Sequence, residues 1–285
     1  MRTLFAPAEG SGAMTSDTRH DTWTQGDPYE AYVGRWSRAV AREFLRALEV
    51  PEGREWLDVG CGTGALAQAI VERAGPAAVV GVDRSEGFVA SARKRIGDPP
   101  VRFELGDAQA LPVPSGAFDA VVSGLVLNFV PDPQRMLSEM ARAARAGGTV
   151  SLYVWDYAGG MELMRRFWDA AKAIDSAAAA LDEGARFPVC APAPLAALLG
   201  DAGLARIATF AIDVPTVFRD FDDYWAPFLG GQGPAPGYAM SLPEARRDEL
   251  RERIRAAMPV GPDGSIRLMA RAWAVRGEKV APQRG

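Results

Sequence analysis

The sequence predicts a doubly wound α/β fold built around a mostly parallel sheet. An apolar strand at residues 56–59 runs directly into a turn that contains Gly60, Gly62 and Gly64, which is typical of a strand that feeds a helix. Further short apolar segments alternate with amphipathic helical segments along the chain. This alternation indicates parallel strands that are joined and covered by helices.

The elements are expected in a regular order from Asp27 onwards. An amphipathic helix begins there and ends before Pro51. Ser85 and Asp132 are expected to be N-caps of two later helices. The predicted helices after the first cover residues 66–74, 85–96 and 134–145, and the predicted strands cover residues 56–59, 78–83, 101–105, 118–122, 149–155 and 266–275.

The glycine turn has the properties of a binding site for a small ligand. Gly60, Gly62 and Gly64 lack a Cβ, so the backbone can adopt positive φ and a ligand can lie directly on its amides. Thr63 is expected to open a helix whose N-terminal N–H groups attract a carboxylate or a phosphate. The spacing from Gly60 through Gly62 to Ala65 also satisfies the dinucleotide-binding fingerprint, so the turn alone leaves two cofactor classes open.

Acidic residues accompany the ends of three consecutive predicted strands. Asp58 lies at the end of the first, Asp83 ends the second, and Asp107 follows the third. An acid at the position of Asp83 can bind both ribose hydroxyls, which either cofactor class requires. Asp107 adds a third carboxylate at the same edge of the sheet. This third acid argues against the dinucleotide-binding class.

The glycine turn and the three acids together resemble the class I S-adenosylmethionine-dependent methyltransferases, in particular the small-molecule branch around the quinone C-methyltransferases. The resemblance covers residues 29–158, with a weaker similarity at residues 195–204. It implies a Rossmann-like sheet of seven strands, with the strand at residues 266–275 antiparallel. It also implies S-adenosylmethionine as the cofactor, S-adenosylhomocysteine as the product, and no metal.

The resemblance also implies which residues contact the cofactor. Asp83 would bind the ribose, Asp107 and the Ala108 amide would bind the adenine, and Ser123 with Gly124 would close the pocket. The methionine end would lie on the glycine turn, and the first helix would cover the cofactor. The full expected set is Tyr32, Trp36, Asp58, Gly60, Cys61, Gly62, Gly64, Asp83, Arg84, Asp107, Ala108, Ser123 and Gly124.

Two departures from the family pattern concern substrate chemistry rather than the cofactor. Asn128 and Phe129 stand where the family often has histidines, and Ala146 stands where it often has a proline before two glycines. The acceptor site therefore has to be predicted from this chain's own residues. The expected substrate contacts are Tyr29, Asn128, Tyr224, Trp225 and Phe228, and Asp156 and Tyr157 are the candidate catalytic residues.

Each of these candidates has a structural alternative. Asp156 could simply cap a turn, and Tyr224 and Trp225 could serve only packing. The aromatic residues of the first helix could belong to the core. Residues 158–193 and 216–263 exceed what the bare fold needs, and they are expected to be lid or substrate insertions in a single domain that covers residues 26–285.

Composition limits the classes of function. A net charge of −4 argues against a general nucleic-acid binder, and no run of about 18 apolar residues predicts a membrane span. Residues 1–25 are expected to be a disordered leader without the features of a signal peptide, so a cytoplasmic location is expected. This leader contains His20, the only histidine, and neither Cys61 nor Cys190 belongs to a cluster with metal-ligand spacing.

The function predicted from the sequence is methyl transfer to a small, partly apolar acceptor. Whether oxygen, nitrogen, sulfur or carbon receives the methyl group stays open, as does the oligomeric state. One alternative is a nicotinamide-dependent oxidoreductase, supported by Ala65 but lacking a Tyr-x-x-x-Lys pair. The other is a regulator that binds S-adenosylmethionine without transferring its methyl group.

Overall fold

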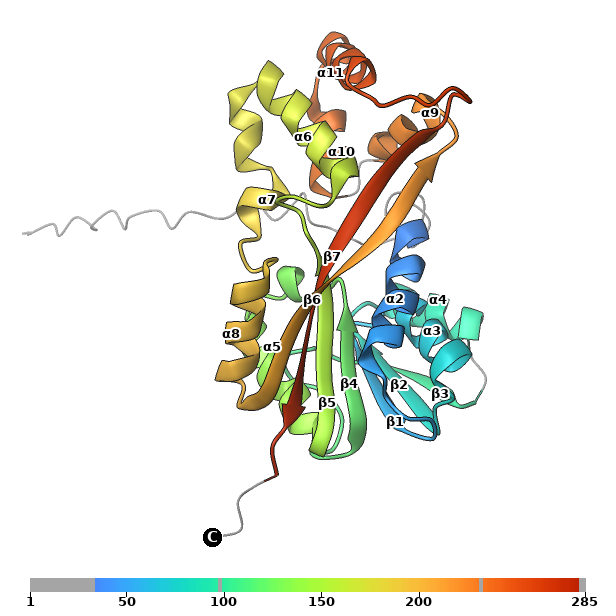
Figure 1. Ribbon diagram of the computed structural model, residues 1–285, viewed down its shortest axis with the longest axis vertical. Helices are drawn as coiled ribbons and strands as arrows, with labels where there is room; N and C mark the ends of the chain where they lie inside the picture. The colour runs from blue at the N-terminus through green and yellow to red at the C-terminus, as the bar shows by residue number, and fades with distance from the viewer. Residues whose placement is uncertain (1–33, 97–98, 231–232, 282–285) are drawn as a thin grey trace, which may run out of the picture.

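The computed structural model describes residues 34–96, 99–230 and 233–281 (Figure 1). Its strands are β1 (Glu55–Val59), β2 (Ala78–Asp83), β3 (Val101–Leu105), β4 (Phe118–Gly124), β5 (Ala144–Trp155), β6 (Leu204–Phe218) and β7 (Ile266–Lys279). They form one seven-stranded sheet in the order β3-β2-β1-β4-β5-β7-β6. Strands β1 to β5 pair in parallel, whereas β7 is antiparallel to both of its neighbours. The predicted fold class is confirmed, including the antiparallel last strand.

Helices lie on both sides of this sheet. Helices α2, α3 and α4 lie on one side, and α5 and α8 lie on the other (Figure 1). The helices are α2 (Arg35–Leu48), α3 (Ala65–Ala74), α4 (Glu86–Ile96), α5 (Pro133–Ala143), α6 (Glu162–Ile174), α7 (Glu183–Arg186), α8 (Pro192–Asp201), α9 (Phe221–Trp225), α10 (Pro234–Ser241) and α11 (Glu244–Ala256), with short 3-10 helices η3 (Leu127–Phe129), η4 (Ser176–Ala180) and η5 (Ala226–Gly230).

Local sequence accounts for the central elements. The apolar runs of β1 and β2 are almost wholly buried, as expected for strands covered on both faces. Both expected N-caps are confirmed. Ser85 Oγ accepts a hydrogen bond from the Phe88 N–H at 3.3 Å, and Asp132 Oδ1 accepts one from the Arg135 N–H at 2.9 Å.

Several boundaries differ from the prediction. Helix α5 ends at Ala143 rather than at residue 145, because Ala144 already pairs with Phe118 and starts β5. The register then shifts, and regular pairing resumes at Thr149, where the strand was expected to begin. Helix α3 begins at Ala65 rather than at Thr63, because the intervening residue is a left-handed glycine.

Strands β6 and β7 are longer than expected and extend beyond the parallel strands. Pairing runs from Leu204 opposite Lys279 to Phe218 opposite Ile266. Residues 216–218, which were expected to begin the second insertion, therefore belong to the sheet. The antiparallel pairing satisfies their backbone groups, so the insertion emerges only after Phe218.

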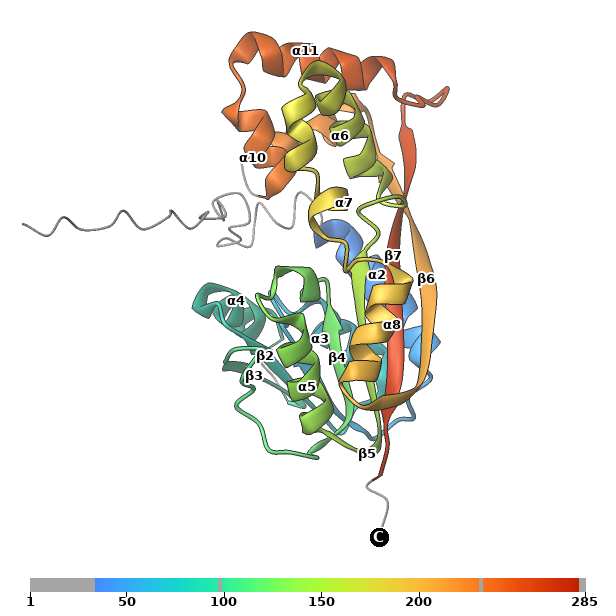
Figure 2. The same cartoon turned by 90° about the vertical axis from the view of Figure 1, so that its left-hand side faces the viewer.

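The two expected insertions lie together in one helical cap, defined here as α6, η4, α7, α9, η5, α10 and α11. The cap lies at the end of the molecule towards which the parallel strands run (Figures 1 and 2). Helix α6 contacts α10 and α11, and the ring of Phe167 in α6 stacks on Phe228 of η5 with 4.6 Å between centroids. Segments that are separate in the sequence thus share one apolar core.

Within the part of the chain that the structure describes, no helix combines the length and apolar character that a membrane crossing needs. Residues 1–25 and the start of the first predicted helix lie outside the described ranges, together with His20, Tyr29 and Tyr32.

Candidate active site

Hydrogen bonds join the glycine turn directly to the end of β2. The Gly62 N–H donates to Asp83 Oδ2 at 2.9 Å, and the Ser85 N–H donates to Oδ1 at 2.8 Å. The N–H groups of Gly60 and Cys61 both donate to the Val82 carbonyl, at 2.7 and 3.1 Å. The turn after β1 and the acid of β2 therefore form one rigid unit at the carboxyl edge of the sheet.

The turn is closed on one side and open on another. Gly60 has a φ of +72°, and a Cβ placed there would lie 2.6 Å from a methyl carbon of Val126. Gly62 has a φ of +53°, and a Cβ there would meet nothing within 4 Å. The backbone around Gly62 therefore leaves room for a ligand, whereas Gly60 has to be a glycine because the segment after β4 lies against it.

Asp58 is a buried carboxyl group without a partner. It is 1% exposed, and neither side-chain oxygen has a hydrogen-bond partner among the described residues. Burial raises its pKa from 3.8 to about 7, and the negative charge of Asp83 adds to this effect. The nearby N–H of Ala67 lowers the pKa of Asp58 and so offsets part of this increase, although it forms no hydrogen bond to the carboxyl group. Such a group is suited to a ligand that brings its own donor or positive charge.

We expect Asp58 to make the ligand-free protein less stable as the pH rises. Its raised pKa means that the folded state keeps a proton between about pH 4 and pH 7 that the unfolded state releases. The free energy of unfolding therefore falls through this window. Asp58→Asn should lower that pH-dependent loss by on the order of 1–3 kcal/mol. Urea unfolding at pH 4.5 and pH 8 measures the loss of unfolding free energy in the wild type and in the variant. Equal losses in the two proteins would contradict a raised pKa of Asp58.

Asp107 lies in the loop after β3, and a residue that the sequence interpretation missed holds this loop. The Asp107 side chain accepts a hydrogen bond from the Gln109 N–H at 2.8 Å. The buried Glu139 of α5 accepts one from the Leu111 N–H at 2.9 Å, and its pKa lies below its ordinary range mainly because Arg142 bonds to it. The spacing of Glu139 and Arg142, three residues apart on a helix, was the available signal.

The end of β4 forms a third side of the candidate site. The buried Ser123 hydroxyl donates to the Val59 carbonyl at 2.7 Å, so it links β4 to β1. A Cβ on Gly124 would lie 2.5 Å from the hydroxyl oxygen of Tyr153, which leaves no room for a side chain. The next residue, Leu125, has a φ of +64°. The chain thus turns sharply away from the sheet beside the glycine turn.

The contacts of Asp156 are those of a turn cap. Its two carboxylate oxygens accept hydrogen bonds from the N–H groups of Gly159 at 3.1 Å and Gly160 at 2.8 Å. Tyr157 is 4% exposed, and its ring centroid lies 5.6 Å from that of Phe187. The structural alternative for Asp156 therefore accounts for its contacts, and its catalytic role stays a prediction, as does that of Tyr157.

Tyr224, Trp225 and Phe228 lie inside the cap. The Tyr224 hydroxyl donates to the Leu163 carbonyl at 2.8 Å, and burial raises its pKa, so the phenol stays protonated and is not available as a general base. The rings of Trp225 and Phe228 lie 5.8 Å apart, and both side chains are buried. Their contacts join the two insertions, as the packing alternative expects, and their role at the acceptor stays a prediction.

The other expected cofactor residues have ordinary surroundings. Trp36 is half-buried and its ring lies 5.5 Å from Phe218, so it packs against the end of β6. Arg84 is exposed and Ala108 is partly exposed at the edge where Asp83 and Asp107 lie. Burial raises the pKa of the Cys61 thiol, which is consistent with a packing role. Gly64, with a φ of +89°, forms the N-cap of α3.

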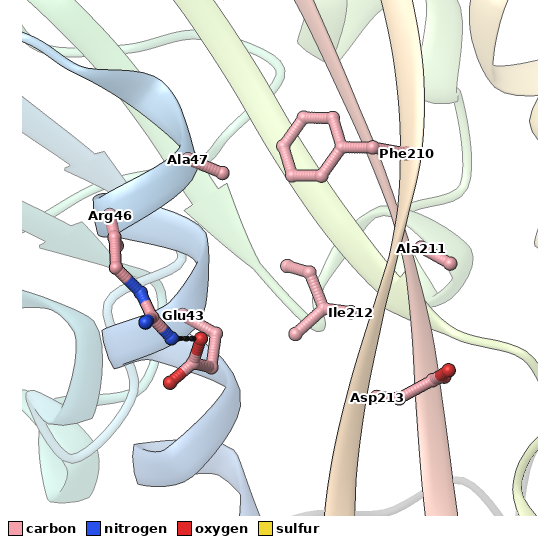
Figure 3. Close-up of a pocket in the computed structure, with 7 residues that line it drawn as sticks. All are labelled: Glu43, Arg46, Ala47, Phe210, Ala211, Ile212 and Asp213. Atoms are coloured by element: carbon pink, nitrogen blue, oxygen red, sulfur yellow. Dashed lines mark ion pairs between the residues drawn. The ribbon is translucent and has the colours of Figure 1, made fainter.

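A separate small cavity lies between α2 and β6 (Figure 3). It has a volume of about 220 Å³, and the rings and methyl groups of Phe210 and Ile212 face α2 across it, with the ion pair of Glu43 and Arg46 on the other side. It contains none of the expected site residues. In the described ranges, no cluster of three or more His, Cys, Asp or Glu side chains is arranged to hold a metal ion.

Comparison with known proteins agrees with this geometry. Residues 57–152 match the family described as "Methyltransferase domain". A trans-aconitate 2-methyltransferase of Variovorax paradoxus is 34% identical over 128 residues, which are 45% of this chain and 48% of that protein. A demethylmenaquinone methyltransferase of Halalkalibacterium halodurans is 37% identical over 117 residues, 40% and 48% of the two chains. The matched part spans about half the length of these relatives.

A solved structure shares the fold. Phosphoethanolamine N-methyltransferase 2 of Haemonchus contortus, in complex with phosphomonomethylethanolamine and S-adenosylhomocysteine, is similar with a TM-score of 0.52 and 16% identity. The match covers 87% of this chain and 53% of that one. At this identity the similarity concerns the fold alone.

The sheet order and the sequence match both agree with the fold of a class I methyltransferase domain. Residues 57–152 of this chain are similar to that domain family, and the predicted resemblance to the small-molecule branch around the quinone C-methyltransferases is confirmed for this segment.

Proposed function

We propose that the protein transfers a methyl group from S-adenosylmethionine to a small, partly apolar acceptor. The observation that carries the proposal is the unit formed by the glycine turn and Asp83, with the Gly62 N–H bonded to the carboxylate. This unit lies at the carboxyl edge of a parallel sheet, where such folds bind their ligands. The matching family and the sheet order support the same conclusion.

The residues at this edge fit the proposed cofactor. Asp58 offers a buried carboxyl group without a partner, which suits an ammonium group. Gly62 offers open backbone. Each oxygen of Asp83 already accepts one backbone hydrogen bond and has capacity for another, which suits two ribose hydroxyls. Asp107 and Ala108 lie next along the edge, where they would contact the adenine.

Position rather than acid–base chemistry is the main contribution that these residues would make. When bound, S-adenosylmethionine supplies a methyl group on a positively charged sulfonium, which leaves as a neutral thioether. The protein then has to align the acceptor atom with the methyl carbon and exclude water. Asp58, Asp83 and the turn would orient the cofactor, and the segments after β4 and β5 would line the acceptor side.

The acceptor is proposed only as a class. The two curated relatives are named for trans-aconitate and for demethylmenaquinone, which differ in size and charge. The net charge of −4 does not favour nucleic acid as the acceptor. A small molecule is therefore the proposed partner.

Calorimetric titration with S-adenosylmethionine, S-adenosylhomocysteine, NAD and NADP tests the proposal. The two sulfur compounds are expected to bind and the nicotinamides are not. Binding of a nicotinamide alone would overturn the proposal in favour of an oxidoreductase, and binding of none would contradict it. Binding of the sulfur compounds without release of S-adenosylhomocysteine in an acceptor screen would favour a non-catalytic regulator.

Asp83→Ala is expected to weaken S-adenosylmethionine binding by roughly 1.5–3 kcal/mol, because two hydrogen bonds to a charged acceptor are lost. The same calorimetry measures it. Asp213→Ala is the matched control, since Asp213 is an exposed acid on β6 that pairs with Arg271, away from the glycine turn. Equal affinity in the Asp83 variant and the wild type would exclude the ribose assignment.

A further inference from the structure

Asn128 is the only asparagine in the chain, and its side chain is unsatisfied. It lies in η3, directly after β4. Its Oδ1 and Nδ2 are both out of contact with solvent, and neither has a hydrogen-bond partner among the described residues. Most buried polar side chains in folded proteins have a partner, so an amide with two unmet groups requires an explanation.

Three aromatic rings from different segments meet at Phe187, and one of them is that of Phe129, the residue that follows Asn128. The Phe129 ring lies 5.5 Å from Phe187 at 78°, and the Tyr157 ring lies 5.6 Å from Phe187 at 52°. Phe129 follows β4, Tyr157 follows β5, and Phe187 follows α7 of the cap. These rings therefore join the cap to the carboxyl ends of two neighbouring parallel strands.

The backbone of the cap also touches the sheet edge at this place. A Cβ on Gly184 of α7 would lie 3.0 Å from the Tyr157 carbonyl oxygen and 3.0 Å from the Ala158 Cα. Strand β4 pairs with β1 on one side and with β5 on the other. Asn128 thus lies between the strand that carries the glycine turn and the strand that meets the cap, which is the acceptor side of the proposed cofactor site.

An asparagine amide presents one acceptor and two donor hydrogens on neighbouring atoms. Its complement is a group that offers a donor next to an acceptor, such as a hydroxyl beside a carbonyl or a carboxamide. Aromatic side chains bind planar rings through offset-stacked or edge-to-face contacts. The amide and the three rings together describe a site for a planar molecule with such a polar edge.

We propose that Asn128 determines acceptor specificity by receiving the polar edge of a planar acceptor that carries a hydrogen-bond donor beside an acceptor. Phe129, Tyr157 and Phe187 form the wall against which the ring of this molecule packs. The inference rests on the proposed function for the role of the site. It goes further because it assigns a residue and a chemical class to the acceptor.

Salicylamide, a ring with a hydroxyl beside a carboxamide, is the probe for this site. Calorimetry follows its binding to protein with and without saturating S-adenosylhomocysteine. Asn128→Leu keeps the size of the side chain and removes both polar groups. It is expected to weaken salicylamide binding by at least about tenfold and to leave S-adenosylhomocysteine binding unchanged.

The same variant is expected to melt at a higher temperature in the ligand-free state, because two unmet polar groups are removed. A residue with a merely structural role would instead lose stability. Thr216→Val is the matched control, since Thr216 Oγ1 is also buried without a partner among the described residues. The last residue of β5 pairs with Ala272 of β7. Thr216 pairs with Leu268 of β7, so it lies beyond the end of β5. This control should gain stability and bind salicylamide as the wild type does.

Three results would overturn the inference: no binding of salicylamide to the wild type in either state, equal binding to Asn128→Leu, or a lower melting temperature of that variant. Failure of the wild type to bind S-adenosylhomocysteine would contradict the proposed function instead. The titration without S-adenosylhomocysteine and the melting temperatures would then still report on Asn128.

Discussion

Phe228→Ala is expected to lower the free energy of unfolding by about 3–5 kcal/mol, the range for removal of a fully buried phenylalanine. Phe228 is 0% exposed and stacks on Phe167 at 4.6 Å. It also contacts the rings of Tyr224 and Trp225. The side chain therefore links the two insertions, and its loss would leave a cavity that the surrounding rings cannot fill without moving. Urea unfolding measures the change.

Leu229→Ala is the control for this substitution. Leu229 follows Phe228 directly but is 45% exposed, so its truncation should change the unfolding free energy by no more than about 0.5 kcal/mol. Binding of S-adenosylhomocysteine should persist in both variants, because neither residue contacts the glycine turn. Similar stability losses in the two variants would show that the cap is not a packed unit joined at Phe228.

Gly60→Ala is expected to cost about 2–5 kcal/mol of stability. A φ of +72° strains any residue with a Cβ, and the added carbon would lie 2.6 Å from Val126. The left-handed conformation alone costs roughly 1–2 kcal/mol, and overpacking adds about 1–3 kcal/mol. The segment after β4 has to move if the strain is to be relieved. Urea unfolding of the ligand-free variant measures the effect.

Gly62→Ala separates strain from overpacking. Gly62 also has positive φ, but nothing lies within 4 Å of its added Cβ, so the expected cost is only about 1–2 kcal/mol. Because this open side is where the cofactor would lie, the same substitution should weaken S-adenosylmethionine binding. Equal stability losses at the two glycines would mean that the contact with Val126 has no energetic weight. Unchanged cofactor binding in Gly62→Ala would contradict a ligand on the open side of the turn.

The parts of the fold that were predicted correctly depend on short-range signals. Strands β1, β2 and β4 are short apolar runs that are almost wholly buried, and the positive φ of Gly60, Gly62 and Gly64 is favoured by the glycine residue itself. The N-caps Ser85 and Asp132 act within three residues of the chain. Such features are visible in a sequence because their causes are local.

The sequence did not reveal contacts between partners that are far apart in the chain. Aromatic residues at 221–228 were interpreted as an acceptor cover, and the structure adds that Phe228 stacks on Phe167, 61 residues earlier. The hydroxyl of Tyr224 donates to the Leu163 carbonyl. An aromatic side chain is equally suited to a core and to a binding site, and only its neighbours in space distinguish the two.

The sequence by itself determined the alternation of strands and helices up to β5, the glycine turn and the acids at the strand ends, because hydrophobic periodicity and glycine conformation depend on local sequence. Only the tertiary structure decided that Asp58 and Asn128 are buried without partners and that two insertions form one cap. Those properties arise when distant segments pack together, since burial and hydrogen-bond satisfaction depend on neighbours that no local pattern specifies.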